Sequence, residues 1–306
     1  MNNPTINLDS IDAYNKLYGL KTSHPLVSVI DLKTATRSVN HISMEYGVYA
    51  LFLKNGAKCS IKYGRRKYDY QEGTVVSFSP GQVIDVDMEE NEFAPDVIGL
   101  MFHPDLIYGT PLAEKISEFR FFDYSEMESL HLSENERSKF LYCLDMINQE
   151  LNHPVDNHSA ALLSANIQVL LEYMDRFYDR QFITRHKVNS DIVAQFHREL
   201  KMYYKEGAVP ASPTVAYFAD KANLSQGYFS DLVRKETGLT PKEIITRHIV
   251  AHAKHLLVKS SDDISQIAYN LGFDYPAHFT RIFKRVTGKN PTQFRAEMAD
   301  KASVLE

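Results

Sequence analysis

A short segment occurs twice near the C-terminus of this chain. It reads VRKETGLTP from Val233 and FKRVTGKNP from Phe283. In both copies a Thr-Gly pair is followed by one further residue, then by Thr or Asn, and then by proline. Glycine readily takes the left-handed conformation that ends a helix, Thr and Asn can cap a helix, and proline is favoured in the first turn of one. Each copy therefore predicts the end of one helix and, directly after it, the beginning of another.

A pair of amphipathic helices is predicted to lead into each copy. In the first pair the positions expected to face inward are Val215, Phe218, Ala219, Ala222, Phe229, Leu232 and Val233. In the second pair they are Ile264, Ile267, Ala268, Leu271, Phe279, Ile282, Phe283 and Val286, and the last four are spaced i, i+3, i+4 and i+7. Two helices joined by a short turn form a helix-turn-helix unit, so the sequence predicts two such units.

One continuous helical pattern, from Pro241 to Lys259, connects the two units. At 1.5 Å per residue this helix is roughly 25–28 Å long. Recognition helices that enter successive major grooves from one side of a duplex lie about one turn, or ~34 Å, apart. A duplicated unit on such a spacer predicts a domain that reads two successive major grooves within one chain.

Basic residues concentrate in this part of the chain. Residues 186–306 carry 17 Lys and Arg against 13 Asp and Glu, a net charge of +4, whereas the whole chain carries −5. From Pro276 to Arg295 there are five Lys and Arg and no acidic residue. A basic face is usually only solvated, but on the second helix of such a unit it suits a major groove, because arginine can bind guanine and both residues bind phosphate. The outward positions of that helix are Ala277, His278, Thr280, Arg281, Lys284 and Arg285.

From Val215 to Arg295 the sequence resembles the AraC/XylS family of bacterial transcription regulators. The resemblance is carried by ISQIAYNLGFDYPAHFTRIFKRVTGKNPTQFR, with support from YFADKANLSQGYFSDLVRKETG and AHAKHLL. It implies activation rather than repression, and contact with RNA polymerase. It also implies base contacts from Pro276, Ala277, His278 and Arg281, phosphate contacts from Lys284 and Arg285, and a first reading face formed by Gln226, Gly227, Ser230 and Asp231. Because Asp231 would repel phosphates, the first unit is expected to read weakly or to rely on Arg234 and Lys235.

Short strand patterns dominate the first 122 residues. Runs of β-branched and aromatic residues, separated by Gly, Pro, Asn and Asp, predict strands at 26–32, 45–54, 59–63, 73–79, 83–86 and 97–102. Such spacing is typical of a sandwich or a small barrel. The run QEGTVVSFSPGQ is similar to a turn in the cupin-type effector domain of many AraC/XylS members. This looser resemblance implies a β-barrel that binds a small-molecule effector, which no sequence feature identifies.

Two helices are predicted between the strands and the basic domain. Ser133 and Glu136 form a capping-box pattern at the start of the first helix. The second helix carries an apolar stripe at a/d spacing, made of Leu163, Ile167, Leu170, Met174 and Phe177. The stripe could be the seam of a homodimer, or the helices could pack on each other or on the barrel. The predicted domains are a regulatory domain at 1–185 and a DNA-binding domain at 186–306.

Several classes of function lack their sequence signatures. His41 and His103 do not belong to a His-x-His pair with a downstream Glu, and the G-x-S-x-G, H-E-x-x-H and phosphate-loop patterns are missing. We therefore expect no catalytic residue, no metal and no cofactor. The spacing of His248, His252 and His255 could suit a metal, but solvation or proximity to DNA is the favoured interpretation. Likewise KYGRRKYDY, at 62–70, is interpreted as a strand with one solvent face rather than a stacking platform for single-stranded nucleic acid.

The remaining features favour the cytoplasm. Two cysteines, Cys59 and Cys143, exclude a disulfide framework and are expected to be buried thiols. The N-terminus carries no secretory pattern, and no apolar run reaches the length of a membrane span. The sequence thus predicts an α+β protein with an N-terminal cupin-like β-barrel and accessory helices, followed by an all-α domain of two helix-turn-helix units joined by a long helix. The predicted function is transcriptional regulation through double-stranded DNA, and the alternative is a sensory module, binding an effector or a partner, with weak or conditional DNA binding.

Overall fold

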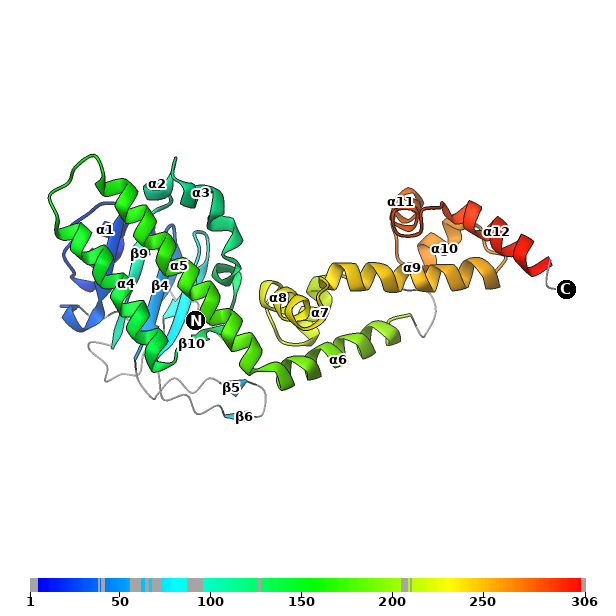
Figure 1. The fold of residues 1–306 in the computed structure, drawn as a ribbon, viewed down its shortest axis with the longest axis horizontal. Helices are drawn as coiled ribbons and strands as arrows, with labels where there is room; N and C mark the ends of the chain where they lie inside the picture. Colours follow the sequence, from blue (N-terminus) through cyan, green and yellow to red (C-terminus); the bar gives the residue numbers. More distant parts are fainter. Residues whose placement is uncertain are drawn as a thin grey trace. The chain divides into compact units, whose positions relative to one another are not determined.

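The computed structural model describes residues 5–37, 39, 42–55, 62–63, 66–67, 73–86, 96–125, 128–204, 209 and 211–303. The chain divides into two compact units, Met1–Thr184 and Arg185–Glu306. The first unit combines strands with helices, and the described residues of the second unit form helices joined by short connections (Figure 1). The predicted α+β class is therefore confirmed.

The strands of the first unit form two main sheets. A three-stranded sheet has the order β1-β3-β8, and a five-stranded sheet has the order β10-β7-β4-β9-β2. β1 and β3 run parallel, and the other pairs are antiparallel. The strands are β1 (Thr5–Leu8), β2 (Val27–Asp31), β3 (Ile42–Tyr46), β4 (Tyr49–Lys54), β5 (Lys62–Tyr63), β6 (Arg66–Lys67), β7 (Thr74–Phe78), β8 (Val83–Val86), β9 (Val97–Phe102) and β10 (Leu130–His131), of which β5 and β6 pair with each other.

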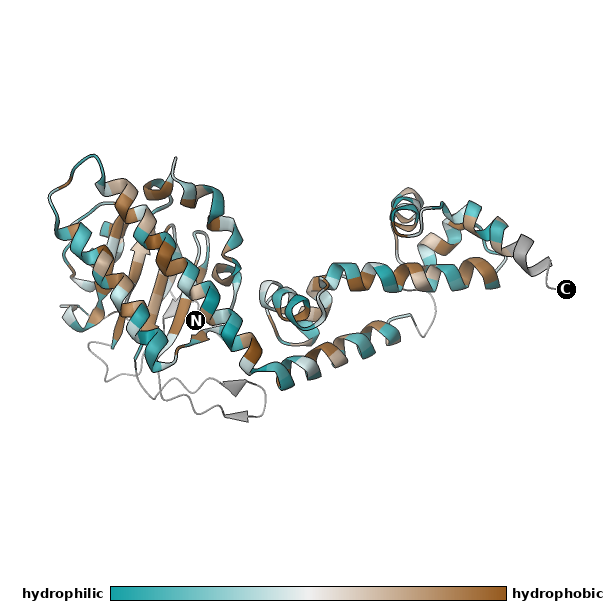
Figure 2. Cartoon of the chain, in the orientation of Figure 1, coloured by the Kyte–Doolittle hydropathy of each residue, from teal (hydrophilic) through white to brown (hydrophobic). Residues whose placement is uncertain are grey.

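An apolar core lies between the two sheets. It is formed by Met44 of β3, by Phe52 of β4 and Phe78 of β7, and by Tyr14 of helix α1 (Ile11–Tyr18), all of them buried. The five-stranded sheet is also buried on its opposite face, where Leu51 and other side chains of β4 alternate with the core residues. Helices α4 (Glu134–Asn152) and α5 (Ser159–Thr184) cover that face, and the covered strands are the most hydrophobic part of the unit (Figures 1 and 2).

The cupin-like barrel expected from the sequence is not confirmed, because the described strands form separate open sheets and no closed barrel. The strand β4 also differs from a strand of such a barrel, because both of its faces are buried. In a barrel whose outer face is exposed to solvent, each strand alternates between apolar and polar side chains. A strand that is buried on both faces instead has a continuous apolar sequence. Ala50–Leu53 of β4 is such a run, and its cause is the pair of helices on its outer face.

The apolar stripe of α5 is used within the first unit. All five of its residues, Leu163, Ile167, Leu170, Met174 and Phe177, are buried. Helix α5 packs along α4, whose capping box is formed by Ser133 and Glu136 as predicted. Of the two interpretations of the stripe, the structure shows intramolecular packing. The other helices of this unit are α2 (Pro104–Ile107), α3 (Pro111–Lys115) and the 3₁₀ helices η1 (Leu32–Thr34), η2 (Ile116–Glu118) and η3 (Arg120–Asp123).

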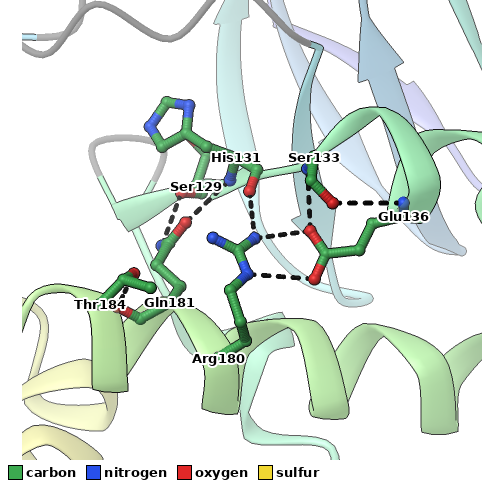
Figure 3. A network of polar contacts seen from close by, with 7 residues as sticks. All are labelled: Ser129, His131, Ser133, Glu136, Arg180, Gln181 and Thr184. Atoms are coloured by element: carbon green, nitrogen blue, oxygen red, sulfur yellow. Dashed lines mark hydrogen bonds and ion pairs between the residues drawn. The ribbon is translucent and has the colours of Figure 1, made fainter.

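A polar network joins the edge strand β10 to α4 and α5 (Figure 3). Arg180 of α5 donates from Nε and Nη2 to the two carboxylate oxygens of Glu136, at 3.0 and 2.7 Å, and from Nη2 to the carbonyl of His131 at 2.6 Å. Gln181 accepts from the backbone N–H of His131 at 2.9 Å and donates to the carbonyl of Ser129 at 3.2 Å. The side-chain amide of Gln181 thus pairs with β10 as a neighbouring strand would.

The second unit contains two helix-turn-helix pairs around one long helix. The linking helix α9 has the predicted bounds, Pro241–Lys259, and it contacts both pairs. The helices are α6 (His186–Met202), α7 (Val215–Lys221), α8 (Gln226–Thr237), α9, α10 (Ile264–Asn270), α11 (Pro276–Thr287) and α12 (Pro291–Ser303). The two predicted helix-turn-helix pairs are therefore α7–α8, the first pair, and α10–α11, the second pair.

Other expectations concern single residues and membrane segments. Cys143 is buried in α4, and burial raises the pKa of its thiol. His103 caps α2 by accepting from the N–H of Asp105. Cys59 and His41, and most of the segment 62–70, lie outside the described residues. Among the helices that the structure describes, none is both long and apolar enough to span a bilayer.

Candidate DNA interface

Local capping residues define the ends of the two helices of the first helix-turn-helix pair, α7 and α8. Thr214 caps α7 by accepting from the N–H of Tyr217, and Ser225 caps α8 by accepting from the N–H of Tyr228 at 3.2 Å. Between the helices Asn223 has a φ of 54°, which asparagine tolerates better than most residues. At the end of α8, Gly238 has the left-handed conformation, with a φ of 74°. The predicted stop signal is confirmed at this position.

Aromatic packing holds the inner face of α8. Phe229 is fully buried, and its ring meets that of Phe196 from α6 edge-on at 5.4 Å. Phe218 of α7 meets the same ring at 4.9 Å. With this face buried, the outward predicted contacts divide into two groups. Gln226, Arg234 and Lys235 are exposed, whereas Gly227 and Ser230 are half-buried.

Asp231 does not lie on this outward face. It is only 9% exposed, because it follows the buried Tyr228 by three positions and so lies on the flank of the buried stripe. The other acid of α8, Glu236, is also withdrawn from solvent and pairs with Nδ1 of His186 at 2.7 Å. The charged side chains that α8 exposes, Arg234 and Lys235, are therefore basic. Asp231 is thus largely shielded from solvent, and its expected repulsion of phosphates stays a prediction.

The second helix-turn-helix pair, α10–α11, presents its basic residues on α11. Phe279 and Phe283 of α11 are fully buried, with ring centroids 5.7 Å apart, and Phe283 also packs on Phe294 of α12. On the outward side, the ring of His278 meets Phe273 edge-on at 5.6 Å, which orients the imidazole. The predicted contacts Ala277, His278, Arg281, Lys284 and Arg285 are exposed, and Pro276 and Thr280 are half-buried. The seven residues predicted as DNA contacts of the second helix-turn-helix pair therefore all lie on α11.

The residue before α11 was not singled out in the sequence. Tyr275 occupies the N-cap position but makes no side-chain cap hydrogen bond, and its side chain is 75% exposed. Ser225, by contrast, caps α8, the corresponding helix of the first helix-turn-helix pair. A signal was present in the sequence, because a capping residue is expected directly before Pro276 at the first helical position.

Two of the three histidines on α9 pack against Tyr204, which lies just after α6. The ring of Tyr204 stacks on His252 at 4.9 Å and on His248 at 6.2 Å, and both imidazoles are half-buried, whereas His255 is exposed. His255 is thus solvated, and His248 and His252 are only partly so, while the predicted proximity of the three histidines to DNA stays a prediction. Within the described part of the chain, no three His, Cys, Asp or Glu side chains are grouped closely enough to hold a metal ion.

These two histidines should make the second unit less stable at acidic pH. Burial lowers the pKa of both imidazoles below 6.5, and nearby positive charge lowers them further. Their neutral forms stabilise the folded state above the unfolded pKa, and this stability is lost as the pH falls from 6.5 through the lowered values. An NMR titration of the imidazole protons in the full chain should give midpoints below 6.5 for His248 and His252. A midpoint at or above 6.5 for either residue would contradict this expectation.

Comparison with known proteins gives one matching family and several relatives. Residues 218–297 match a family described as "Helix-turn-helix domain". The Msm operon regulatory protein of Streptococcus mutans is 27% identical over 161 residues, which cover 53% of this chain and 56% of that protein. The HTH-type transcriptional activator RhaR of Escherichia coli is 30% identical over 146 residues, which cover 46% and 48%. The HTH-type transcriptional activator RhaS of Escherichia fergusonii is 35% identical over 77 residues, which cover 25% and 28%.

The chain thus spans about half, or less, of the length of these curated relatives. A solved structure that resembles part of the chain is the C-terminal domain of AraT, a response regulator from Geobacillus stearothermophilus. It is 24% identical, covers 35% of this chain and 84% of its own, and has a TM-score of 0.32.

Proposed function

Because this chain belongs to the AraC/XylS family of transcriptional regulators, through its helix-turn-helix domain, we propose that it binds a specific double-stranded DNA site and activates transcription. The observation that carries the proposal is the outer face of α11. Arg281, Lys284 and Arg285 are exposed there, and the sequence from Pro276 to Arg295 contains no acid to oppose a phosphate backbone.

In this proposal each recognition helix enters one of two successive major grooves. Helix α11 contacts bases and phosphates through Pro276, Ala277, His278, Thr280, Arg281, Lys284 and Arg285. Helix α8 contributes Gln226, Gly227, Ser230, Arg234 and Lys235. We omit Asp231 from the proposed contacts because it is buried. Helix α11 exposes three basic side chains, whereas α8 exposes two, so α11 supplies the larger share of the binding free energy in this proposal.

The N-terminal residues 1–185 are proposed to regulate this activity in the cytoplasm. Their two sheets enclose an aromatic core, with Tyr14 stacked on Phe52 at 5.8 Å, which is compatible with a divergent cupin-like effector domain. Tyr142 of α4 and Leu162 and Val169 of α5 are 58%, 47% and 46% exposed, which supports a homodimer through the outer faces of these helices. A small-molecule effector would act by changing the dimer, and RNA polymerase would be the target of activation.

Tyr275 extends the proposed reading face of α11. A tyrosine at an N-cap stabilises a helix less than serine does, and within the described part of the chain its side chain makes no ring contact or hydrogen bond. Replacing Tyr275 with serine should therefore raise the free energy of unfolding of the C-terminal unit by about 1 kcal/mol. It should also weaken DNA binding, because the ring and hydroxyl no longer reach the duplex. Thermal denaturation and a fluorescence-anisotropy titration with DNA measure the two effects.

A matched control for Tyr275 lies in the same helix-turn-helix pair. Tyr269 of α10 is 52% exposed and lies within a helix rather than at a cap, so Tyr269→Ser should not stabilise the protein or weaken DNA binding. If Tyr275→Ser bound DNA as tightly as the unmodified protein, Tyr275 would not be a contact.

The proposed function is tested by selecting genomic DNA fragments with the purified full chain at physiological salt. A shared motif with two half-sites about one helical turn apart is expected. Recovery of unrelated fragments without a motif would contradict sequence-specific binding by the chain alone. It would favour a sensory module that needs an effector or a partner before it binds DNA.

A further inference from the structure

The turn of the second helix-turn-helix pair is held by the segment that follows α6. Ser212 donates from its backbone N–H to the carbonyl of Gly272 at 2.8 Å, and Val209 donates to the carbonyl of Asn270 at 3.2 Å. Between these two bonds, the hydroxyls of Ser212 and Tyr204 both donate to the carbonyl of Leu271, at 3.1 and 3.3 Å. We call the donors Tyr204, Val209 and Ser212, with the acceptors at 270–272, the clasp.

The backbones meet closely at Gly272. Its φ is +79°, and a Cβ atom built there would lie 2.2 Å from the carbonyl carbon of Ala211 and 2.4 Å from the nitrogen of Ser212. Both neighbours are backbone atoms, which cannot rotate away as a side chain could. Glycine is therefore required for the approach as well as for the left-handed conformation.

The same segment is anchored to the first helix-turn-helix pair. Phe196 of α6 packs on Phe218 and Phe229, as described above, and the ring of Tyr203 meets Tyr217 of α7 edge-on at 5.3 Å. One stretch of chain thus holds the first pair through α6 and the second pair through the clasp. It acts alongside α9, which contacts both pairs.

The two connections constrain the second pair differently. Packed helices such as α9, α10 and α11 can slide over each other by small amounts. Hydrogen bonds to three consecutive carbonyls define one register, because each requires a nearby donor with good alignment. We therefore infer that the clasp fixes the orientation of α11 relative to α8, and so sets the half-site spacing that the chain accepts. Tyr204, Ser212 and Gly272 are positioning residues in this inference, which rests on the proposed DNA binding.

Removing two side-chain donors tests the inference without adding a steric clash. Tyr204→Phe combined with Ser212→Ala removes both bonds to the Leu271 carbonyl and leaves the apolar packing in place. The DNA probes are the selected site and versions with one or two base pairs added or removed between the half-sites. Each base pair shifts the second half-site by about 3.4 Å along the duplex and rotates it by about 35°. The unmodified chain should bind the altered spacings poorly, and the variant should lose about fivefold or more of that discrimination.

A control and an independent readout separate the possible outcomes. Thr246→Ala also removes a hydroxyl, one that donates to the Lys242 carbonyl within α9, and should leave the spacing preference unchanged. In the full chain without DNA, the amide protons of Val209 and Ser212 should exchange faster in the double variant than in either control protein.

Faster exchange together with tolerance of altered spacing supports the inference. Unchanged exchange, or affinity lowered equally at all spacings, would overturn it while leaving the proposed function intact. If the unmodified chain bound no preferred site, the proposed function would fail and the inference about spacing with it.

Discussion

Replacing Arg281 with alanine is expected to weaken binding to the selected DNA site by about 1–3 kcal/mol, which is about 5- to 150-fold, and to relax the base preference at one position. Arg281 is exposed in the first half of α11, the part of a recognition helix that meets base edges. Its planar guanidinium can donate two hydrogen bonds to a single guanine, which alanine cannot replace. Phe279 and Phe283 on the opposite side remain buried, so the fold of α11 should be unchanged.

The measurement is a competition titration of the full chain against every single-base variant of the selected site. Lys284→Ala serves as the comparison, since Lys284 lies one turn nearer the end of α11 and is expected to contact phosphate. Its replacement should weaken binding to all sequences alike and reduce the slope of log affinity against log salt by about 1. If Arg281→Ala weakened specific and random DNA equally, Arg281 would be a phosphate contact and not a reader of bases.

Features set by neighbouring residues could be predicted from the sequence. The start of α9 depends on Thr240, Pro241 and Glu243, whose capping box closes within four residues, and the predicted bounds agree with the structure. The end of α8 depends on Gly238 and on neighbouring Thr237, whose hydroxyl bonds to the Val233 carbonyl. The exposed basic face of α11 follows from helical periodicity once Phe279 and Phe283 are assigned to the core.

Features set by distant residues could not be predicted in this way. The contact between Glu236 of α8 and His186 joins residues of two different helices, which local sequence does not reveal. Gly272 reads locally as a turn glycine, and only its contact with Ala211 and Ser212 shows that a second chain segment fills the space beside it. The absence of a closed barrel among the described strands likewise depends on pairing between distant strands and on the helices that cover β4. Helical units could thus be placed from local signals, whereas sheet closure could not.

The polar network beneath β10 gives the largest expected effect on the stability of the first unit. Arg180→Ala should lower the free energy of unfolding by about 2–3 kcal/mol, less than the 3–5 kcal/mol typical of a fully buried pair. The reason for the reduction is partial solvent access, since the side chains of Arg180 and Glu136 are 34% and 14% exposed. The loss remains large because the mostly buried Glu136 carboxylate loses both donors from Arg180, and because the His131 carbonyl loses its donor.

Urea denaturation of the full chain measures this loss, and hydrogen exchange at the His131 amide assigns it to the first unit, because that amide bonds to Gln181 beside Arg180. Arg176→Ala is the matched control, since Arg176 is exposed one turn earlier on α5 and its replacement should change stability by no more than about 0.5 kcal/mol. Glu136→Gln completes a double-mutant cycle. Because the pair acts as a unit, the double variant should be less destabilised than the sum of the single variants. Additive losses would show that the ion pair contributes nothing of its own, and that β10 is held to α5 by the amide of Gln181.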